Sequence, residues 1–334
     1  MIYSSTRGSD LNLKFGDVLL NGLAKDGGLY VPNSLKFYSE KELDFLRELD
    51  YPGLAFELTK DFVLDEISES EYKKICINSY NKSFGKEIIS FDKLDQYKYI
   101  ANLFNGPTYA FKDFALQLLG NIYEYVLKKR KIKLTILGAT SGDTGSAAIH
   151  GCAKSKNVKI FILFPLNKVS EIQRKQMTTI DKQNVFNIAV KGDFDDCQRM
   201  VKNYFKLNNE NKKINLAAVN SINWVRIMGQ IVYYFWSYFR VSDRFDPMNF
   251  VVPSGNFGNA YAGYISKKMG LPIKKIIIGS NKNDILTRFF KTGKMKIKKT
   301  LTSLSPSMDI QVSSNFERLL FDFYENGKMI EKLF

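Results

Sequence analysis

Residues 134–145 read Leu-Thr-Ile-Leu-Gly-Ala-Thr-Ser-Gly-Asp-Thr-Gly, an apolar run followed at once by a turn rich in glycine and hydroxyl side chains. The run has the composition of a buried strand, and the residues after Thr144 have the apolar period of a helix. A strand that passes through a short turn into a helix is the first half of a βαβ unit. This stretch therefore predicts an α/β fold built on a parallel sheet.

The same alternation extends along most of the chain. Strand-like runs occupy 134–137, 159–164, 185–190, 250–252 and 275–278, and helical stretches occupy 114–128, 144–153, 170–178, 195–205, 224–239, 259–269 and 283–290. Before them, helical periodicity dominates, for example over 40–49 and 51–62. We predict a mainly helical N-terminal domain over 1–98 and an α/β region over 99–334. This region should hold two open sheet domains, the smaller inserted over 131–212.

Composition narrows the class of protein. With 334 residues, 45% hydrophobic and 25% charged, the chain has the composition of a globular protein. No apolar run approaches the ~20 residues that cross a bilayer, so we expect no membrane partner. The net charge of +15 is spread along the chain, and its lysine clusters lack interleaved aromatic residues. We therefore expect a lysine-rich surface and no nucleic-acid partner, although an anionic small substrate would benefit from the field.

Histidine and cysteine usage excludes several chemistries. His150 is the only histidine, which rules out a histidine-rich metal centre, and its place at the end of a helical stretch favours a structural role. The three cysteines are scattered without CxxC spacing. This pattern favours reduced thiols in the cytoplasm and predicts no metal site.

Two strand-to-helix turns have the composition of anion cradles. The first spans 138–145, and the second, Pro-Ser-Gly-Asn-Phe-Gly-Asn, spans 253–259. Glycines let backbone N–H groups converge on a ligand, and a helix N-terminus adds positive potential. Neither turn has the spacing of a dinucleotide fingerprint or a P-loop. Together they predict a site for two anionic groups.

A lysine with reactive surroundings precedes the first turn. Lys112 lies between Phe111 and Asp113 at the start of a helical stretch. A lysine that forms a Schiff base needs a partly desolvated setting, which a neighbouring aromatic ring helps to create. On its own, Lys112 is one of 49 basic residues and would be read as a surface lysine.

The context of Lys112 changes that reading, because residues 107–113, PTYAFKD, resemble the cofactor-lysine segment of the threonine synthase family. Further segments follow in family order: 15–32 (FGDVLLNGLAKDGGLYVP), 137–148 (LGATSGDTGSAA), 164–177 (FPLNKVSEIQRKQM), 219–230 (VNSINWVRIMGQ) and 252–270 (VPSGNFGNAYAGYISKKMG). The resemblance covers residues 3 to at least 310. It implies the tryptophan synthase β-like fold of fold-type II enzymes that use pyridoxal 5'-phosphate (PLP).

The resemblance also implies roles for individual residues. Lys112 would be the catalytic residue and would hold PLP as an internal aldimine. The cofactor phosphate would be bound by Ser254, Gly255, Asn256, Phe257, Gly258 and Asn259. The substrate α-carboxylate would be bound by Thr140, Ser141, Gly142, Asp143 and Thr144. The substrate phosphate would be bound by Lys168, Ser170, Asn223 and Arg226, the last of which is open to an alternative reading as a solvated charge on a helix.

The reaction implied is the conversion of O-phospho-L-homoserine and water into L-threonine and phosphate, the last step of threonine biosynthesis, by a monomer or homodimer. Members of the family generally continue past the equivalent of Phe334. We therefore expect a truncated or unusually short chain, without the hydroxyl residue that meets the pyridine nitrogen.

Three alternatives stay open from sequence. One is another PLP-dependent lyase that eliminates phosphate from a phosphorylated amino acid. The second is a non-catalytic relative that binds a phosphorylated ligand. The third is a basic nucleic-acid-binding protein, which would bind with steep salt dependence.

Overall fold

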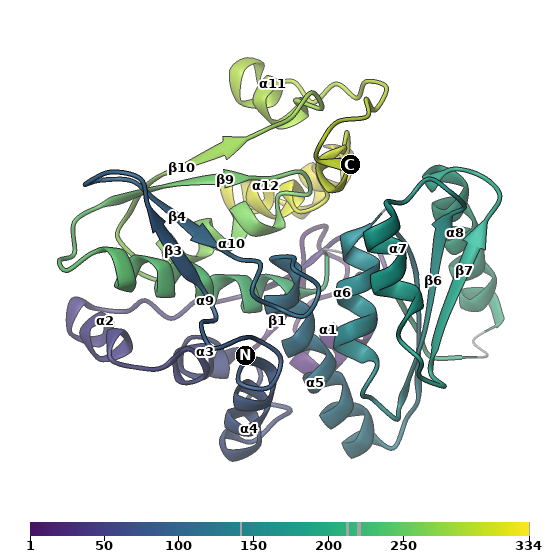
Figure 1. The fold of residues 1–334 in the computed structure, drawn as a ribbon, viewed down its shortest axis with the longest axis horizontal. Helices are drawn as coiled ribbons and strands as arrows, with labels where there is room; N and C mark the ends of the chain where they lie inside the picture. The colour runs from purple at the N-terminus through teal and green to yellow at the C-terminus, as the bar shows by residue number, and fades with distance from the viewer. Residues whose placement is uncertain (141, 212–213, 219–221, 334) are drawn as a thin grey trace. The chain divides into compact units, whose positions relative to one another are not determined.

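The computed structural model of the chain describes residues 1–140, 142–211, 214–218 and 222–333 (Figure 1). Packing divides the chain into two compact units. The first unit combines Met1–Cys76, Phe91–Ala101 and Ser221–Phe334, and the second combines Ile77–Ser90 and Asn102–Asn220. The first unit is therefore assembled from both ends of the chain.

The second unit is built on a four-stranded parallel sheet with the order β7-β6-β5-β8. Its elements are α5 (Lys112–Arg130), β5 (Leu134–Ala139), α6 (Asp143–Cys152), β6 (Val158–Pro165), α7 (Glu171–Thr178), β7 (Val185–Val190), α8 (Phe194–Asn211) and β8 (Leu216–Ala218). In register, Leu134 lies opposite Val158, and Ile136 lies opposite Ala217. Because the strands are parallel, the loops that follow β5 and β6 leave the sheet at the same edge.

Both faces of the neighbouring strands β5 and β6 are largely buried, whereas Phe186 and Ile188 of the edge strand β7 are exposed. On one face, Leu137 and Leu163 pack with Cys197 of α8 in an apolar cluster. Ile136 and Ile160 point to the opposite face and are fully buried as well. Burial on both faces explains why the strands read as continuous apolar runs.

Helices α5 and α6 cross closely at two glycines. A Cβ added at Gly120 would lie 1.9 Å from the carbonyl oxygen of Gly151, and one added at Gly151 would lie 2.4 Å from that of Leu116. Only a residue without a side chain permits such an approach. The crossing fixes Lys112 and Asp143 relative to each other, because they are the first residues of the two helices.

The first unit contains the remaining elements. They are β1 (Tyr3–Ser5), α1 (Phe15–Asn21), β2 (Tyr30–Pro32), α2 (Glu40–Arg47), α3 (Tyr51–Thr59), η1 (Lys60–Phe62), α4 (Glu69–Tyr80, whose last turn belongs to the second unit), β3 (Ser90–Lys93), β4 (Tyr99–Asn102), α9 (Trp224–Val241), β9 (Met248–Pro253), α10 (Gly258–Lys268), β10 (Ile273–Gly279), α11 (Ile285–Thr292), η2 (Pro306–Met308), α12 (Phe316–Tyr324) and α13 (Gly327–Leu333). Strands β9 and β10 pair in parallel, and β1 and β2 pair antiparallel.

Helix α9 forms the centre of this unit. It is apolar around most of its circumference and is covered by α1, α3 and α10. The Tyr3 ring meets the Trp224 indole edge-on at 6.4 Å, and its hydroxyl donates a 2.7 Å hydrogen bond to the carbonyl oxygen of Phe62. The N-terminal strand and helices therefore share a core with the chain after residue 221.

The expected α/β fold built on parallel strands is confirmed, and each strand and helix expected between 114 and 290 is present. The boundaries of the two compact units differ from those of the predicted domains, which are 1–98, 99–334 and an insertion over 131–212. The difference arises because the apolar faces of the N-terminal helices are buried against α9, so these helices do not pack as a unit of their own. The domain assignment itself stays a prediction.

Candidate active site

Lys112 lies at the first turn of α5, in an ion pair. Its Nζ donates to both carboxylate oxygens of Asp143, at 2.6 and 2.7 Å. The two side chains are 12% and 19% exposed, and the Phe111 ring centroid lies 5.4 Å from Nζ. The lysine thus has the partly desolvated surroundings and the aromatic neighbour that a reactive amine requires.

Asp113 holds the loop that leads to Lys112. This carboxylate is fully buried and accepts hydrogen bonds from Thr108 N at 2.8 Å and Thr108 Oγ1 at 2.7 Å. Burial raises the pKa of the Asp113 carboxyl, against the effect of the Thr108 hydrogen bonds. Within this loop Tyr109 adopts a left-handed backbone conformation with φ of 56°. Asp113 therefore fixes an otherwise unfavourable turn next to the lysine.

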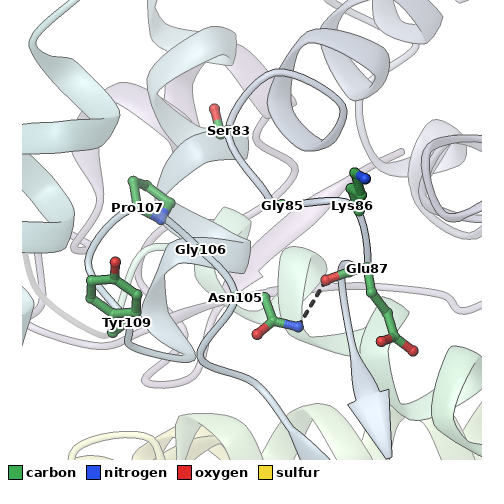
Figure 2. A pocket seen from close by; sticks show the side chains of 8 residues that line it. All are labelled: Ser83, Gly85, Lys86, Glu87, Asn105, Gly106, Pro107 and Tyr109. Carbon is green, nitrogen blue, oxygen red and sulfur yellow. Dashed lines mark hydrogen bonds between the residues drawn. The ribbon is translucent and has the colours of Figure 1, made fainter.

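A hollow of about 450 Å³ lies beside the same loop (Figure 2). Its lining is Ser83, Gly85, Lys86, Glu87, Asn105, Gly106, Pro107 and Tyr109. Among these lining residues, Asn105 donates a 2.8 Å hydrogen bond through its side chain to the carbonyl oxygen of Glu87. Neither Lys112 nor Asp143 lines this hollow, so we assign it no part in the chemistry.

The turn after β5 is shaped by Thr140. Its buried hydroxyl accepts hydrogen bonds from the N–H groups of Gly142 and Gly145, at 3.1 and 3.0 Å. These two donors are thereby used inside the turn. Asp143 points to Lys112, and Thr144 is half-buried on the first turn of α6. Ser141 lies outside the described residues.

The loop after β6 carries the predicted Lys168 and Ser170. Both side chains are exposed. Ser170 is the N-cap of α7, where its hydroxyl accepts from the Gln173 N–H at 3.3 Å. This cap role accounts for a serine at the position without any ligand.

The loop between β9 and α10 exposes a row of backbone donors. Ser254 Oγ donates to Asn259 Oδ1 at 2.6 Å, so these two side chains are occupied with each other. Phe257 has a φ of 65°, a left-handed conformation that costs roughly 1–2 kcal/mol for a residue other than glycine. Among the described residues, the N–H groups of 255–259 find no acceptor. Such a row at a helix N-terminus suits a phosphate group.

Asn223 and Arg226 lie in the first turn of α9. Asn223 is 2% exposed and caps the helix, since its Oδ1 accepts from Val225 N at 3.1 Å and its Nδ2 donates to the carbonyl oxygen of Leu19 at 3.0 Å. Arg226 is only 3% exposed. The alternative reading of Arg226 as a solvated surface charge is therefore wrong, and a buried guanidinium requires polar partners.

The predicted site residues fall into two sets. The second unit contains Lys112, the turn of 140–144, Lys168 and Ser170, and the first unit contains the loop of 254–259, Asn223 and Arg226. Sequence reasoning missed Asp113 as the residue that fixes the lysine loop, and it missed the pairing of Asp143 with Lys112. The adjacency of Asp113 to Lys112 was the only available signal for the first.

Comparison with known proteins places these residues in context. The family described as "Threonine synthase N terminus" matches residues 2–80, and the family described as "Pyridoxal-phosphate dependent enzyme" matches residues 99–330. Threonine synthase of Pseudomonas aeruginosa is 51% identical over the whole chain, and that of Eremothecium gossypii is 45% identical over 96% of it. The chain spans 71% and 66% of these two relatives.

A solved structure supports the same family. The crystal structure of PLP-bound threonine synthase from Brucella melitensis superposes with a TM-score of 0.95 at 42% identity, over 99% of this chain and 72% of that one. The fold and the lysine segment therefore define a PLP-dependent enzyme of fold type II. Within this class, the chain belongs to the threonine synthase family.

Each unit, taken by itself, offers one group that suits part of the cofactor. Lys112 supplies a half-desolvated amine, and the loop of 254–259 supplies backbone donors without protein acceptors in the described part of the chain. Among the described residues, no cluster of three or more His, Cys, Asp or Glu side chains could hold a metal ion. None of the described helices is long and apolar enough to span a membrane.

Proposed function

We propose that this chain carries out the threonine synthase reaction, in which O-phospho-L-homoserine and water give L-threonine and inorganic phosphate. The observation that supports it most directly is the Lys112–Asp143 pair at the first turns of α5 and α6, in a chain that is 51% identical to a threonine synthase over its whole length. Lys112 is the lysine that holds PLP.

The binding roles follow from the donors that each loop offers. The backbone of Ser254 to Asn259 holds the cofactor phosphate. The turn of 140–144 receives the substrate α-carboxylate through Thr144 and the backbone N–H groups that Thr140 does not occupy. Arg226 is assigned to the substrate phosphate, because a buried guanidinium fork matches phosphate oxygens. Asn223, Lys168 and Ser170 are the further residues that the family resemblance assigns to this phosphate.

PLP supplies an electron sink for negative charge at the substrate Cα. The Lys112 amine, once released, takes the proton from Cα and moves protons at Cα and Cβ. Asp143 holds that amine within 2.7 Å and so keeps it oriented between transfers. Phosphate leaves from Cγ as a proton is removed from Cβ, and a proton is then delivered to Cγ to form the methyl group. Water adds at Cβ to give the threonine hydroxyl, and a proton returns to Cα.

The test is an absorbance spectrum of purified protein with PLP, for wild type and Lys112→Ala, before and after borohydride. We expect a band near ~410–430 nm that borohydride removes irreversibly and that Lys112→Ala lacks. Equal bands in both proteins would contradict the assignment of Lys112. Product analysis then separates this function from the lyase alternative, since threonine and phosphate form in one case and an oxo acid with ammonia in the other.

Two finer proposals accompany this function. The enzyme works in the cytoplasm, which the free, buried thiols of Cys76, Cys152 and Cys197 support. It acts as a monomer or a homodimer on its small phosphorylated substrate, and gel filtration with light scattering distinguishes the two states.

A further inference from the structure

The loop of 254–259 is held by the segment that leads into α12. Ser313 Oγ donates a 2.6 Å hydrogen bond to the carbonyl oxygen of Gly255. The backbone N–H and the Nδ2 of Asn315 both donate to the carbonyl oxygen of Asn256, at 3.1 and 3.2 Å. Ser313 and Asn315 are 2% and 0% exposed. Three hydrogen bonds from these two buried residues therefore fix two successive carbonyl groups of the loop.

These bonds also fix the direction of the loop's donors. In a planar trans peptide, the C=O group and the N–H group of the next residue point in opposite directions. No described peptide bond is cis. The Gly255 carbonyl points to Ser313, so the Asn256 N–H in the same peptide group points away from Ser313. In the same way, the Asn256 carbonyl points to Asn315, and the Phe257 N–H points away from Asn315. Both N–H groups belong to the row without acceptors in the described residues.

Arg318 sets the orientation of the Asn315 amide. Its Nη1 donates to Asn315 Oδ1, and an arginine has no acceptor to offer, so Nδ2 must face Asn256. Arg318 is itself fully buried and donates through Nε to the carbonyl oxygen of Tyr30 at 3.0 Å. The amide has one possible orientation, which fits a positioning role.

The aromatic residue beside Asn315 supports the same loop. The Phe316 ring meets the Phe257 ring edge-on, with centroids 5.1 Å apart. Phe257 is the loop residue with left-handed φ, and it is 4% exposed. Ser313, Asn315 and Phe316 thus brace the loop at three successive residues.

We infer that Ser313 and Asn315 are positioning residues for the cofactor phosphate: they aim the Asn256 and Phe257 N–H groups and thereby set the affinity for PLP. The inference rests on the proposed function, which assigns the phosphate to this loop. Neither side chain touches the phosphate itself. Their effect should therefore appear only with ligands that carry a phosphate group.

The experiment compares PLP with pyridoxal, which keeps the aldehyde and lacks the phosphate. Each is titrated into the full chain and followed by the borohydride-reducible band. We expect Ser313→Ala to weaken PLP binding about fivefold, as for loss of one neutral hydrogen bond. Asn315→Asp should weaken it about tenfold or more, because the Nδ2 hydrogen bond is lost and a carboxylate oxygen then faces the Asn256 carbonyl, while the backbone N–H contact stays. Pyridoxal binding should change less than twofold. Ser313→Thr keeps the hydroxyl donor and should restore PLP affinity.

Two further variants separate the possible failures. Ser266→Ala removes a buried hydroxyl of α10 that bonds to Ala262 at 2.8 Å, and it should change neither ligand. Asn256→Asp puts a negative charge into the loop itself and should abolish the preference for PLP over pyridoxal. If Asn256→Asp leaves that preference intact, the phosphate assignment of the proposed function fails.

If Asn256→Asp removes the preference while the Ser313 and Asn315 variants keep it, only the present inference is overturned. An equal loss for PLP and pyridoxal in Ser313→Ala, without recovery in Ser313→Thr, would also overturn it, because the role would then be structural. Asn315→Asp retains the Arg318 contact and so should fold. If it does not fold, the comparison of Ser313→Ala with Ser313→Thr still tests whether this segment positions the phosphate-binding loop.

Discussion

Replacing Gly120 with alanine should force α5 and α6 apart and weaken the second unit. The added Cβ would lie 1.9 Å from the carbonyl oxygen of Gly151 and 2.5 Å from its carbonyl carbon. The helices must separate by roughly 1.5 Å to reach an ordinary van der Waals distance. Both partners are backbone atoms in helices, so no side chain can rotate away.

The magnitude follows from two opposing effects. Overpacking of this kind costs about 3 kcal/mol, at the upper end of its usual range, because the clash involves backbone atoms. Alanine in place of a helical glycine returns about 1 kcal/mol. We therefore expect a net destabilisation of about 2 kcal/mol. The same separation would move the first residues of α5 and α6 apart and lengthen the 2.6 Å contact between Lys112 and Asp143. The lysine would then be less well oriented, so the PLP band should weaken.

The assay is equilibrium urea unfolding followed by fluorescence, with the PLP band as a second readout. Gly85→Ala is the matched control, because nothing lies within 4 Å of a Cβ added at Gly85. It should leave both the urea midpoint and the band unchanged. If Gly120→Ala is as stable as Gly85→Ala and binds PLP normally, the glycine crossing does not set the geometry of the lysine.

Arg7→Ala should destabilise the first unit by about 2–3 kcal/mol in urea unfolding, because it leaves the buried Glu317 carboxylate without its bidentate partner. Lys74→Ala, at an exposed ion pair, should cost less than about 0.5 kcal/mol, and an equal effect of both would refute the distinction. Burial lowers the pKa of His150, so the folded chain resists its protonation, and stability should fall as pH drops below about 6.5. As the only histidine, it should account for that loss, and His150→Gln should have a flatter profile of urea midpoint between about pH 7 and pH 5.5.

The regular part of the fold could be predicted because its signal is local. Strands β5, β6 and β7 are apolar runs between turn residues, and helices α5 and α9 have clear periodicity. The three-residue strands β1, β2 and β8 could not be predicted, since such short runs carry no pattern. Their place is decided by tertiary pairing.

The site could be predicted only in part. The motif residues Lys112 and Asp143 are visible in the sequence, but their ion pair is a product of the α5–α6 crossing. Ser313 and Asn315 carry no sequence signal, because they contact a loop 58 and 59 residues earlier in the chain. Contacts over that distance depend on the path that β10 and α11 give the chain between the loop of 254–259 and Ser313.

The pairing of Thr6 and Arg7 with Glu317 joins residues 311 and 310 positions apart. At a ribosomal rate of about 5–20 residues per second, the N-terminal strand waits roughly 15–60 s for this partner to be synthesised. Tyr3 and Tyr30, fully buried in the finished protein, are without their final core during that time. The inserted second unit, whose residues emerge together, can complete its sheet first. Folding during synthesis should thus begin in the middle of the chain, with the first residues among the last to be buried.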